Sequence, residues 1–351
     1  MTVVTAALRS IASLSISLLP VVVFLIVLIT IDSYKLVRFR SVLTAILSGS
    51  IAAFACLWLS SWILGAVVAD PTIFARYVAP AVEEFLKAVL VVVLIHRKRI
   101  GFMVDATIYG FAVGAGFAIV ENIYYFKFLE NPHLVVWIIR GFGTAVMHGG
   151  VTAIMAIVSK QLADQYSLTG RGRDGFGAIV VFVPGLTVAY LLHSAYNHFF
   201  FSPVLSTMGI LVILPQLVWV VFRASERATR KWLGVRFDTD AELLEIIQTG
   251  RVTESRIADY FESLRTRFSG EVVVDMLCML RLHLELSIRA KGILLMREAG
   301  FKPPDEPEIE EKFRELKYLE KSIGKTGLLA ASPMFNMSDR DIWQLSLLAK
   351  N

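Results

Sequence analysis

Residues 77–95 read YVAPAVEEFLKAVLVVVLI, and this stretch decides the fold class. It can cross a bilayer as an α-helix, because the hydrocarbon core is about 30 Å thick and a helix rises about 1.5 Å per residue. The same stretch carries three charged residues, Glu83, Glu84 and Lys87. A charge at membrane depth costs a few kcal/mol, so such residues are functional candidates.

Six other apolar stretches of similar length lie on either side of this one. Hydrophobic residues make up 56% of the chain and the mean hydropathy is +0.63, whereas a soluble domain is about 45–50% apolar. We therefore predict an all-α, polytopic membrane helix bundle in residues 1–222. Its seven expected spans cover roughly residues 11–31, 43–68, 77–95, 102–126, 136–158, 177–201 and 204–222.

Basic residues predict the orientation of the bundle, because cytoplasmic loops carry an excess of lysine and arginine. Such residues follow the first, third, fifth and seventh spans, and the alternate loops hold few. We therefore expect the N-terminus outside and the C-terminus in the cytoplasm. The clusters are Lys35, Arg38 and Arg40; Arg97, Lys98 and Arg99; Lys160, Arg171 and Arg173; and Arg223, Arg227, Arg230 and Lys231.

Residues 223–351 have the composition of a soluble helical domain, with 21 basic and 21 acidic residues, while residues 1–222 hold the whole net charge of +5. No basic face stands apart from the loops, which argues against a nucleic-acid partner. Thr239-x-x-Glu242 predicts a helix start, a long helix is expected over 271–299, and a charged helix over 308–322 should end at Gly324. We predict a cytoplasmic regulatory or docking domain that binds a cytoplasmic partner.

Polar residues recur inside four of the expected spans. With the predicted orientation and a rise of about 1.5 Å per residue, Glu83, Glu121, His148, His193 and Asn197 lie about 6–12 Å below the outer interface. His198, at the outer end of its span, is expected to be interfacial. Scattered structural polar residues would not be expected to share one layer. The residues are Glu83, Glu84 and Lys87; Glu121 and Asn122; His148; and His193, Asn197 and His198.

Each of these residues also has a structural interpretation. A glutamate can pair with Lys87, His148 can be a core histidine beside glycines, and His193 with Asn197 can join helices by hydrogen bonds. Asp105 and Arg140 are expected to be boundary residues, with Arg140 reaching the outer interface. The cluster as a whole indicates a functional site more strongly than any one member does.

The pattern of these residues resembles that of the PrsW-type intramembrane proteases, relatives of the CAAX prenyl endopeptidases and bacteriocin-immunity membrane proteases. The resemblance covers roughly residues 75–200, and Glu121 favours the PrsW branch because the prenyl-protease branch has histidine there. It implies an integral protein of the bacterial inner (cytoplasmic) membrane that cleaves a single-pass membrane protein, with an anti-sigma factor as an example. The matching residues are Glu83-Glu84 with Lys87, Phe117 to Glu121, His148, and His193 to Asn197.

Peptide hydrolysis requires a base that activates water and donors that stabilise an oxyanion. We assign Glu83 as the general base, with Glu121 helping to hold or activate the water. His193 and Asn197 are the expected oxyanion donors, and His148 is expected to bind water or support the site. Glu84 and Lys87 are expected to orient the base. This reading needs no cofactor. The alternative is a zinc ion held by Glu121, His148 and His193.

Two other classes remain open at this point. Intramembrane glutamate and histidine chains also serve as proton relays in transporters, which would have polar groups continuing toward the cytoplasmic side. A non-catalytic membrane sensor, with residues 223–351 as its output, is the third possibility.

Overall fold

The computed structural model describes residues 3–32, 34, 37–66, 70–129, 133–168, 180–249, 256–304, 308–335 and 339–348. These residues form helices and no strand, which confirms the all-α class. The basic residues Lys35, Arg171 and Arg173, which entered the orientation argument, lie outside this set. The chain divides into two compact units, Met1–Ser225 and Glu226–Asn351.

Five helical stretches are long and apolar enough to cross a membrane, against the seven spans expected. They are Ser10–Thr30, Phe39–Leu64, Met103–Phe128, Leu134–Ser167 and Pro203–Gln248. The other two expected spans correspond to α4 (Ala79–His96), which carries three charged residues, and α9 (Val183–Asn197), which has only 15 residues. The two elements that do not qualify as spans are therefore two that carry the polar residues of the predicted site.

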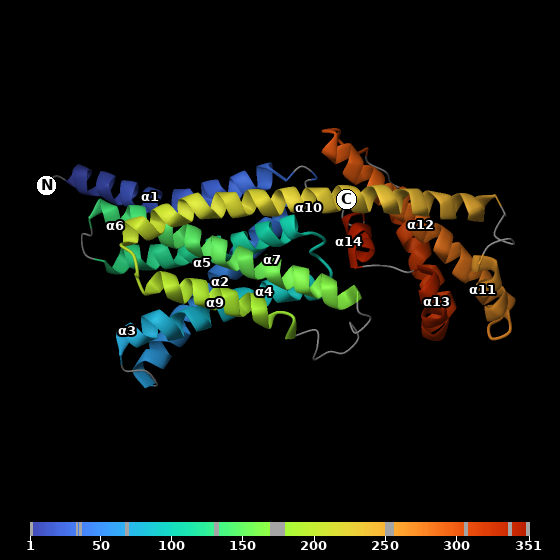
Figure 1. Cartoon of the computed structure of the whole chain (residues 1–351), viewed down its shortest axis with the longest axis horizontal. Helices are drawn as coiled ribbons and strands as arrows, with labels where there is room; N and C mark the ends of the chain where they lie inside the picture. The colour runs from blue at the N-terminus through green and yellow to red at the C-terminus, as the bar shows by residue number, and fades with distance from the viewer. Residues whose placement is uncertain are drawn as a thin grey trace. The chain divides into compact units, whose positions relative to one another are not determined.

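In the first unit, α5 (Met103–Phe128) lies at the centre, with α2 and α7 as its principal neighbours (Figure 1). Most of its residues are buried inside the protein. The remaining helices of this unit are α1 (Val3–Thr30), α2 (Phe39–Ala66), α3 (Pro71–Ile73), α6 (Leu134–Ile138), α7 (Val146–Leu168) and the first part of α10 (Pro203–Gln248).

Glycine lets α5 approach α7 closely. A Cβ atom at Gly110 would lie 2.7 Å from the carbonyl oxygen of Thr152 on α7, and one at Gly114 would collide with the backbone of His148. Small residues of this kind allow membrane helices to pack backbone to backbone. The close approach brings the end of α5 that holds Glu121 beside the start of α7, where His148 lies.

Two π-helical segments precede helices of the site. Segment η1 (Phe74–Val78) runs into α4, and η2 (Ile139–Ala145) joins α6 to α7. Such segments often occur at functional sites. Ser194 Oγ donates to the carbonyl oxygen of Arg76 at 2.7 Å, and this hydrogen bond attaches α9 to η1.

Helix α7 extends further than the expected span 136–158. It continues to Leu168, so Lys160 belongs to the helix and not to a cytoplasmic loop. Lys160 is buried and its Nζ atom forms an ion pair with Asp164 Oδ1 at 2.6 Å. An acidic partner one helical turn away explains how a lysine assigned to a loop is held in the helix.

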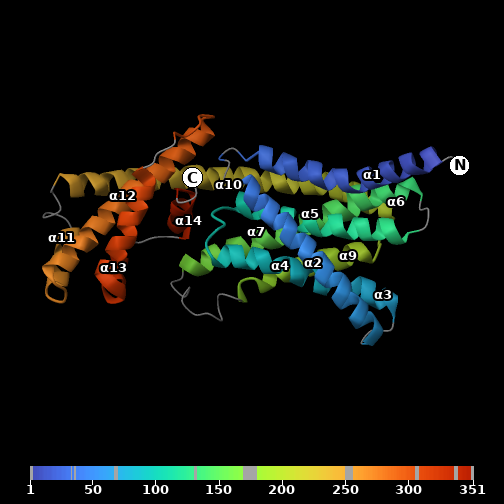
Figure 2. The ribbon, with the colours of Figure 1, turned by 180° about the vertical axis from the view of Figure 1, so that it is seen from behind.

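The second unit is a helical domain with its own core, formed by the end of α10 and by α11 (Arg256–Arg265), α12 (Gly270–Glu298), α13 (Glu308–Phe335) and α14 (Asp339–Leu348) (Figure 2). The predicted helix 271–299 is confirmed, and Gly300 follows it with a φ of 81°. The break at Gly324 is also confirmed, because its φ of 70° interrupts α13.

The helix start predicted at Thr239 is wrong. Helix α10 runs without interruption from Pro203 to Gln248, and Thr239 lies inside it. The threonine hydroxyl donates to the carbonyl oxygen of Val235 at 2.8 Å, one turn back along the same helix. A threonine hydroxyl can bond the carbonyl one turn back inside a helix as well as cap a helix start. The capping-box pattern alone therefore did not show that a helix begins here.

Candidate active site

Glu84 joins α4 to α9 inside the first unit. Its Oε1 atom lies 2.5 Å from Lys87 Nζ and 2.7 Å from His193 Nδ1. All three side chains are buried, with residue exposures of 2%, 0% and 2% for Glu84, Lys87 and His193. A buried charge is stable only when it is paired and hydrogen-bonded, and this carboxylate has both partners.

His148 connects three helices at the same place. Its Nδ1 atom lies 3.0 Å from Lys87 Nζ on α4, and its Nε2 atom lies 2.9 Å from Glu121 Oε2 on α5. Phe117, one turn before Glu121, packs against the His148 ring with centroids 5.2 Å apart. The Lys87 ammonium also lies 4.6 Å from the centre of the Phe117 ring. The four sequence motifs therefore meet in one cluster.

Glu83 faces one ring nitrogen of each histidine, Nε2 of His193 and Nδ1 of His148. We call these the inner nitrogens, and the other nitrogen of each ring the outer nitrogen. The Oε2 atom of Glu83 lies 3.8 Å from His193 Nε2 and 4.0 Å from His148 Nδ1. This oxygen is buried and has no hydrogen-bond partner among the described residues. Separations of this size between polar atoms are those at which a water molecule bridges. The position of Glu83 is suited to binding a water between a carboxylate and two imidazoles.

Each histidine has a carboxylate behind it. Glu84 accepts from Nδ1 of His193, and Glu121 accepts from Nε2 of His148 when these nitrogens carry the proton. A carboxylate on one ring nitrogen fixes the tautomer and leaves the lone pair of the other nitrogen free. The free lone pair of His193 then faces Glu83. The free lone pair of His148 faces both Lys87 and Glu83.

The same atoms could hold a metal ion. Ligand atoms of Glu83, His148 and His193 all lie within 4.8 Å of one another. Two imidazole nitrogens and one carboxylate oxygen are a donor set of zinc sites, and a carboxylate behind each histidine is typical of them. The zinc set expected from the sequence had Glu121 as the carboxylate ligand. Glu121 instead lies on the outer nitrogen of His148, and Glu83 takes the inner position.

Asn197 lies one turn after His193 but contacts a different element. Its Nδ2 atom donates to the carbonyl oxygen of Ala75 in η1, at 3.0 Å. The oxyanion role expected for Asn197 would have to use the second N–H of this amide. In the described contacts, Asn197 attaches the end of α9 to the segment that leads into α4.

The sequence assigns Arg140 to the membrane boundary, and the structure adds partners for it on α5 that the sequence did not predict. Its guanidinium turns toward α5, where NH2 lies 3.3 Å from Glu121 Oε1 and Nε donates to Asn122 Oδ1 at 2.9 Å. The side chain of Arg140 is only 13% exposed. The available signal was an arginine inside one predicted span and an unpaired acidic residue inside another.

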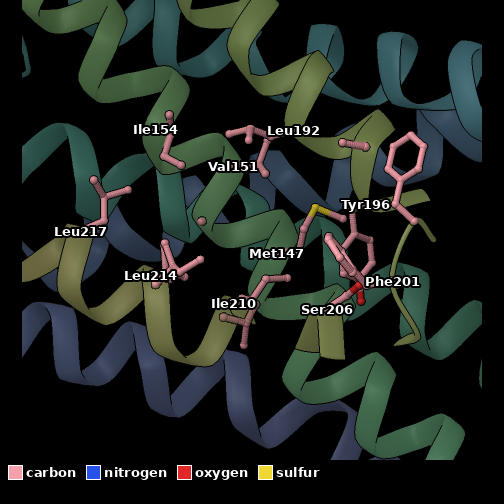
Figure 3. Close-up of a pocket in the computed structure, with 15 residues that line it drawn as sticks. Met147, Val151, Ile154, Leu192, Tyr196, Phe201, Ser206, Ile210, Leu214 and Leu217 are labelled. Carbon is pink, nitrogen blue, oxygen red and sulfur yellow. The ribbon is translucent and has the colours of Figure 1, made fainter. Parts of the chain in front are cut away.

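A pocket of about 320 Å³ lies next to this cluster, between α7, α9 and α10 (Figure 3). Met147 and Leu192, the residues before His148 and His193, line it together with Tyr196 and Leu214. No charged side chain lines this pocket. It can hold apolar groups but offers no acid or base, so any hydrolytic chemistry belongs to the cluster around Glu83.

Comparison with known protein families gives one match. The family described as PrsW family intramembrane metalloprotease matches residues 37–222. No curated protein and no solved structure gives a significant match to the chain. The matched region covers more than half of the chain and contains every residue of the cluster. The chain therefore belongs to the PrsW family of intramembrane metalloproteases, and it is an integral membrane protein and an intramembrane protease.

Proposed function

We propose that the protein is an intramembrane endopeptidase of the glutamate type, with Glu83 as the general base. The observation that carries this proposal is the Oε2 atom of Glu83, which is buried, has no hydrogen-bond partner among the described residues and faces both histidines. A carboxylate in a site largely removed from water is suited to moving a proton to and from a reacting group.

In the proposed reaction, the Glu83 carboxylate takes a proton from a bound water while the water oxygen attacks the scissile carbonyl carbon. The carbonyl oxygen becomes an oxyanion in a tetrahedral intermediate. Glu83 then gives the same proton to the amide nitrogen as the C–N bond breaks, which releases an amine and a carboxylic acid. The Glu83 carboxylate is restored, and no other reactant is needed.

We assign oxyanion stabilisation to His193. Its Nδ1 atom is held by Glu84 at 2.7 Å, and its Nε2 atom faces the Glu83 side of the cluster. When Nε2 is protonated it becomes a donor, and the Glu84 carboxylate stabilises the resulting imidazolium, as the aspartate does in serine-protease triads. Asn197 is assigned to holding η1 through Ala75, where it fixes the start of the helix that carries Glu83.

Zinc-dependent hydrolysis is the second candidate, because Glu83, His148 and His193 fit a zinc site. A zinc ion bound there would polarise the carbonyl group and lower the pKa of a bound water. We prefer the glutamate type because Lys87 Nζ lies 3.0 Å from Nδ1 of His148. A fixed ammonium at the ligating nitrogen repels a dication and competes for the same lone pair.

Metal removal distinguishes the two candidates. We expect purified protein in bilayers to retain its cleavage rate within about twofold after dialysis against a zinc chelator, because every proposed proton transfer uses side chains alone. Metal content is measured on the same sample by mass spectrometry. Loss of cleavage on chelation, restored by one equivalent of zinc, would contradict the glutamate type and establish the zinc-dependent reaction.

For the substrate, we propose a single-pass membrane protein cut near the outer face, with an anti-sigma factor as an example. Membership of the family supports a membrane-protein substrate. The distribution of basic residues supports an N-out, C-in chain of seven spans, which puts the Glu83 cluster in the outer half of the bacterial inner membrane. Residues 223–351 would then be a cytoplasmic domain that docks a regulatory partner.

Fragment profiling tests the activity and names the substrate. Membrane-protein fragments are quantified in cells that make wild-type protein or His193→Gln at matched levels. We expect fragments that end near the outer membrane face in the wild-type cells only, because His193→Gln loses the imidazole that faces Glu83. Identical profiles under several envelope stresses would contradict the proposed function.

A further inference from the structure

Arg140 holds the end of α5 by three contacts of one guanidinium group. NH2 forms an ion pair with Glu121 at 3.3 Å, Nε donates to Asn122 at 2.9 Å, and the group lies 3.8 Å from the centre of the Tyr125 ring. Nε makes a hydrogen bond, whereas NH2 has no hydrogen-bond partner among the described residues and acts on Glu121 through its charge.

The ion pair divides the Glu121 carboxylate between two partners. Its Oε1 atom faces Arg140, and its Oε2 atom lies 2.9 Å from His148 Nε2. The guanidinium charge beside one oxygen favours the orientation in which the other oxygen accepts from His148. The protonated Nε2 of His148 leaves the lone pair on Nδ1, which faces Lys87 and Glu83.

Helix α1 fixes Arg140 in turn. Asn122 Nδ2 donates to the carbonyl oxygen of Ser17 on α1 at 2.7 Å, so the acceptor of Arg140 Nε is itself tied to α1. A Cβ atom at Gly141, the residue after Arg140, would collide with the carbonyl oxygen of Ile16. Helix α1 therefore packs against the backbone of η2 at the arginine. It lies outside the region that matches the family, residues 37–222.

We propose that Arg140 is a positioning residue for hydrolysis, which acts by holding Glu121 so that Glu121 fixes the ring orientation and tautomer of His148. The expected effect of Arg140 on cleavage rests on the proposed function. The expected effect of Arg140 on the His148 ring does not. Helix α1 takes part through Ser17 and the close contact at Gly141. Arg140 touches neither Glu83 nor His193 in the described contacts, so it is not assigned a part in the chemistry.

The first test reads the His148 ring directly. Full-length protein with ¹⁵N-labelled histidine is placed in bilayers, and the His148 signals are assigned by comparison with His148→Gln. We expect wild type to show Nε2 protonated and Nδ1 unprotonated, and Arg140→Gln to show a mixture of tautomers. Lys127→Gln removes an exposed positive charge near the end of the same helix, α5, and should leave the spectrum unchanged.

The second test measures how fast fragments of the substrate accumulate in cells. Loss of a residue that orients a site group typically costs about 10- to 100-fold in activity, and we expect this for Arg140→Gln. Because Arg140 acts through Glu121, the double variant Arg140→Gln/Glu121→Gln should be no slower than Glu121→Gln alone. Arg140→Lys should recover only part of the rate, since it keeps the charge but loses the Nε hydrogen bond to Asn122 and the planar face that lies over Tyr125.

The two readouts separate the possible failures. An unchanged His148 spectrum in Arg140→Gln, a wild-type rate in that variant, or losses that add in the double variant would each overturn the role of Arg140. Absence of fragments from wild-type cells would instead contradict the proposed function, and it would remove the role of Arg140 in hydrolysis even if the tautomer shifts.

Discussion

Glu83→Gln is expected to lower the rate of fragment accumulation by about 10³-fold, within the range of general-base losses. The amide has nearly the same shape as the carboxylate but cannot take a proton from water. The Oε2 atom of Glu83 makes no hydrogen bond with the described residues, so the substitution breaks none there. We therefore expect the unfolding midpoint of purified Glu83→Gln in detergent to stay close to that of wild type.

The matched control for this prediction is Glu262→Gln. This glutamate has a side chain 71% exposed and pairs with Arg265, which is itself 62% exposed. An exposed pair contributes little, about 0–1 kcal/mol, so this variant should cleave and unfold as wild type does. A wild-type cleavage rate in Glu83→Gln would show that water is activated elsewhere, with Glu121 the next carboxylate to test.

Lys87→Met is expected to reduce the free energy of unfolding by about 3–5 kcal/mol, the cost of breaking a buried ion pair from one side. The Lys87 side chain is fully buried and lies between Glu84 Oε1 at 2.5 Å and His148 Nδ1 at 3.0 Å. Methionine fills a similar volume but leaves the Glu84 carboxylate with one fewer partner in the protein interior. Cleavage should be lost as well, because both histidines depend on this arrangement.

A second variant tests the cause of that loss. In Glu84→Gln/Lys87→Met both charges are absent, so we expect the double variant to be more stable than Lys87→Met alone, although still inactive. Lys127→Met is the control at an exposed position and should change the free energy of unfolding by less than about 0.5 kcal/mol. Equal destabilisation by Lys87→Met and Lys127→Met would show that Lys87 is not part of a buried ion pair.

The sequence was sufficient for the class of the fold and for most members of the cluster, although it missed Arg140 and included Asn197, which contacts η1. Apolar stretches of membrane-spanning length are a local property, so α1, α2 and α5 could be predicted from composition alone. Charged and imidazole side chains inside such stretches are costly without partners, so Glu83, Glu121, His148 and His193 could be expected to meet. Gly300 and Gly324 also marked helix ends, because positive φ angles favour glycine.

Helix boundaries and contact partners could not be read in the same way. Thr239 has the pattern of a capping box, yet its hydroxyl donates to a backbone carbonyl inside α10. A threonine hydroxyl can make a hydrogen bond both at a helix start and inside a helix. Lys160 was assigned to a loop and lies in α7, because Asp164 one turn away pairs with it. Both errors come from local patterns that are compatible with two structures.

The sequence by itself determined that four helices carry polar groups that must find one another in an apolar medium. Only the tertiary structure decided how they pair. Glu121 lies on Nε2 of His148, Glu84 lies on Nδ1 of His193, and Glu83 is the carboxylate that faces the other nitrogen of each ring. It also decided that Arg140 pairs with Glu121. The reason is physical, because burial dictates that a charge needs a partner, whereas the packing of α5 against α7 and of η2 against α1 determines which partner lies within reach.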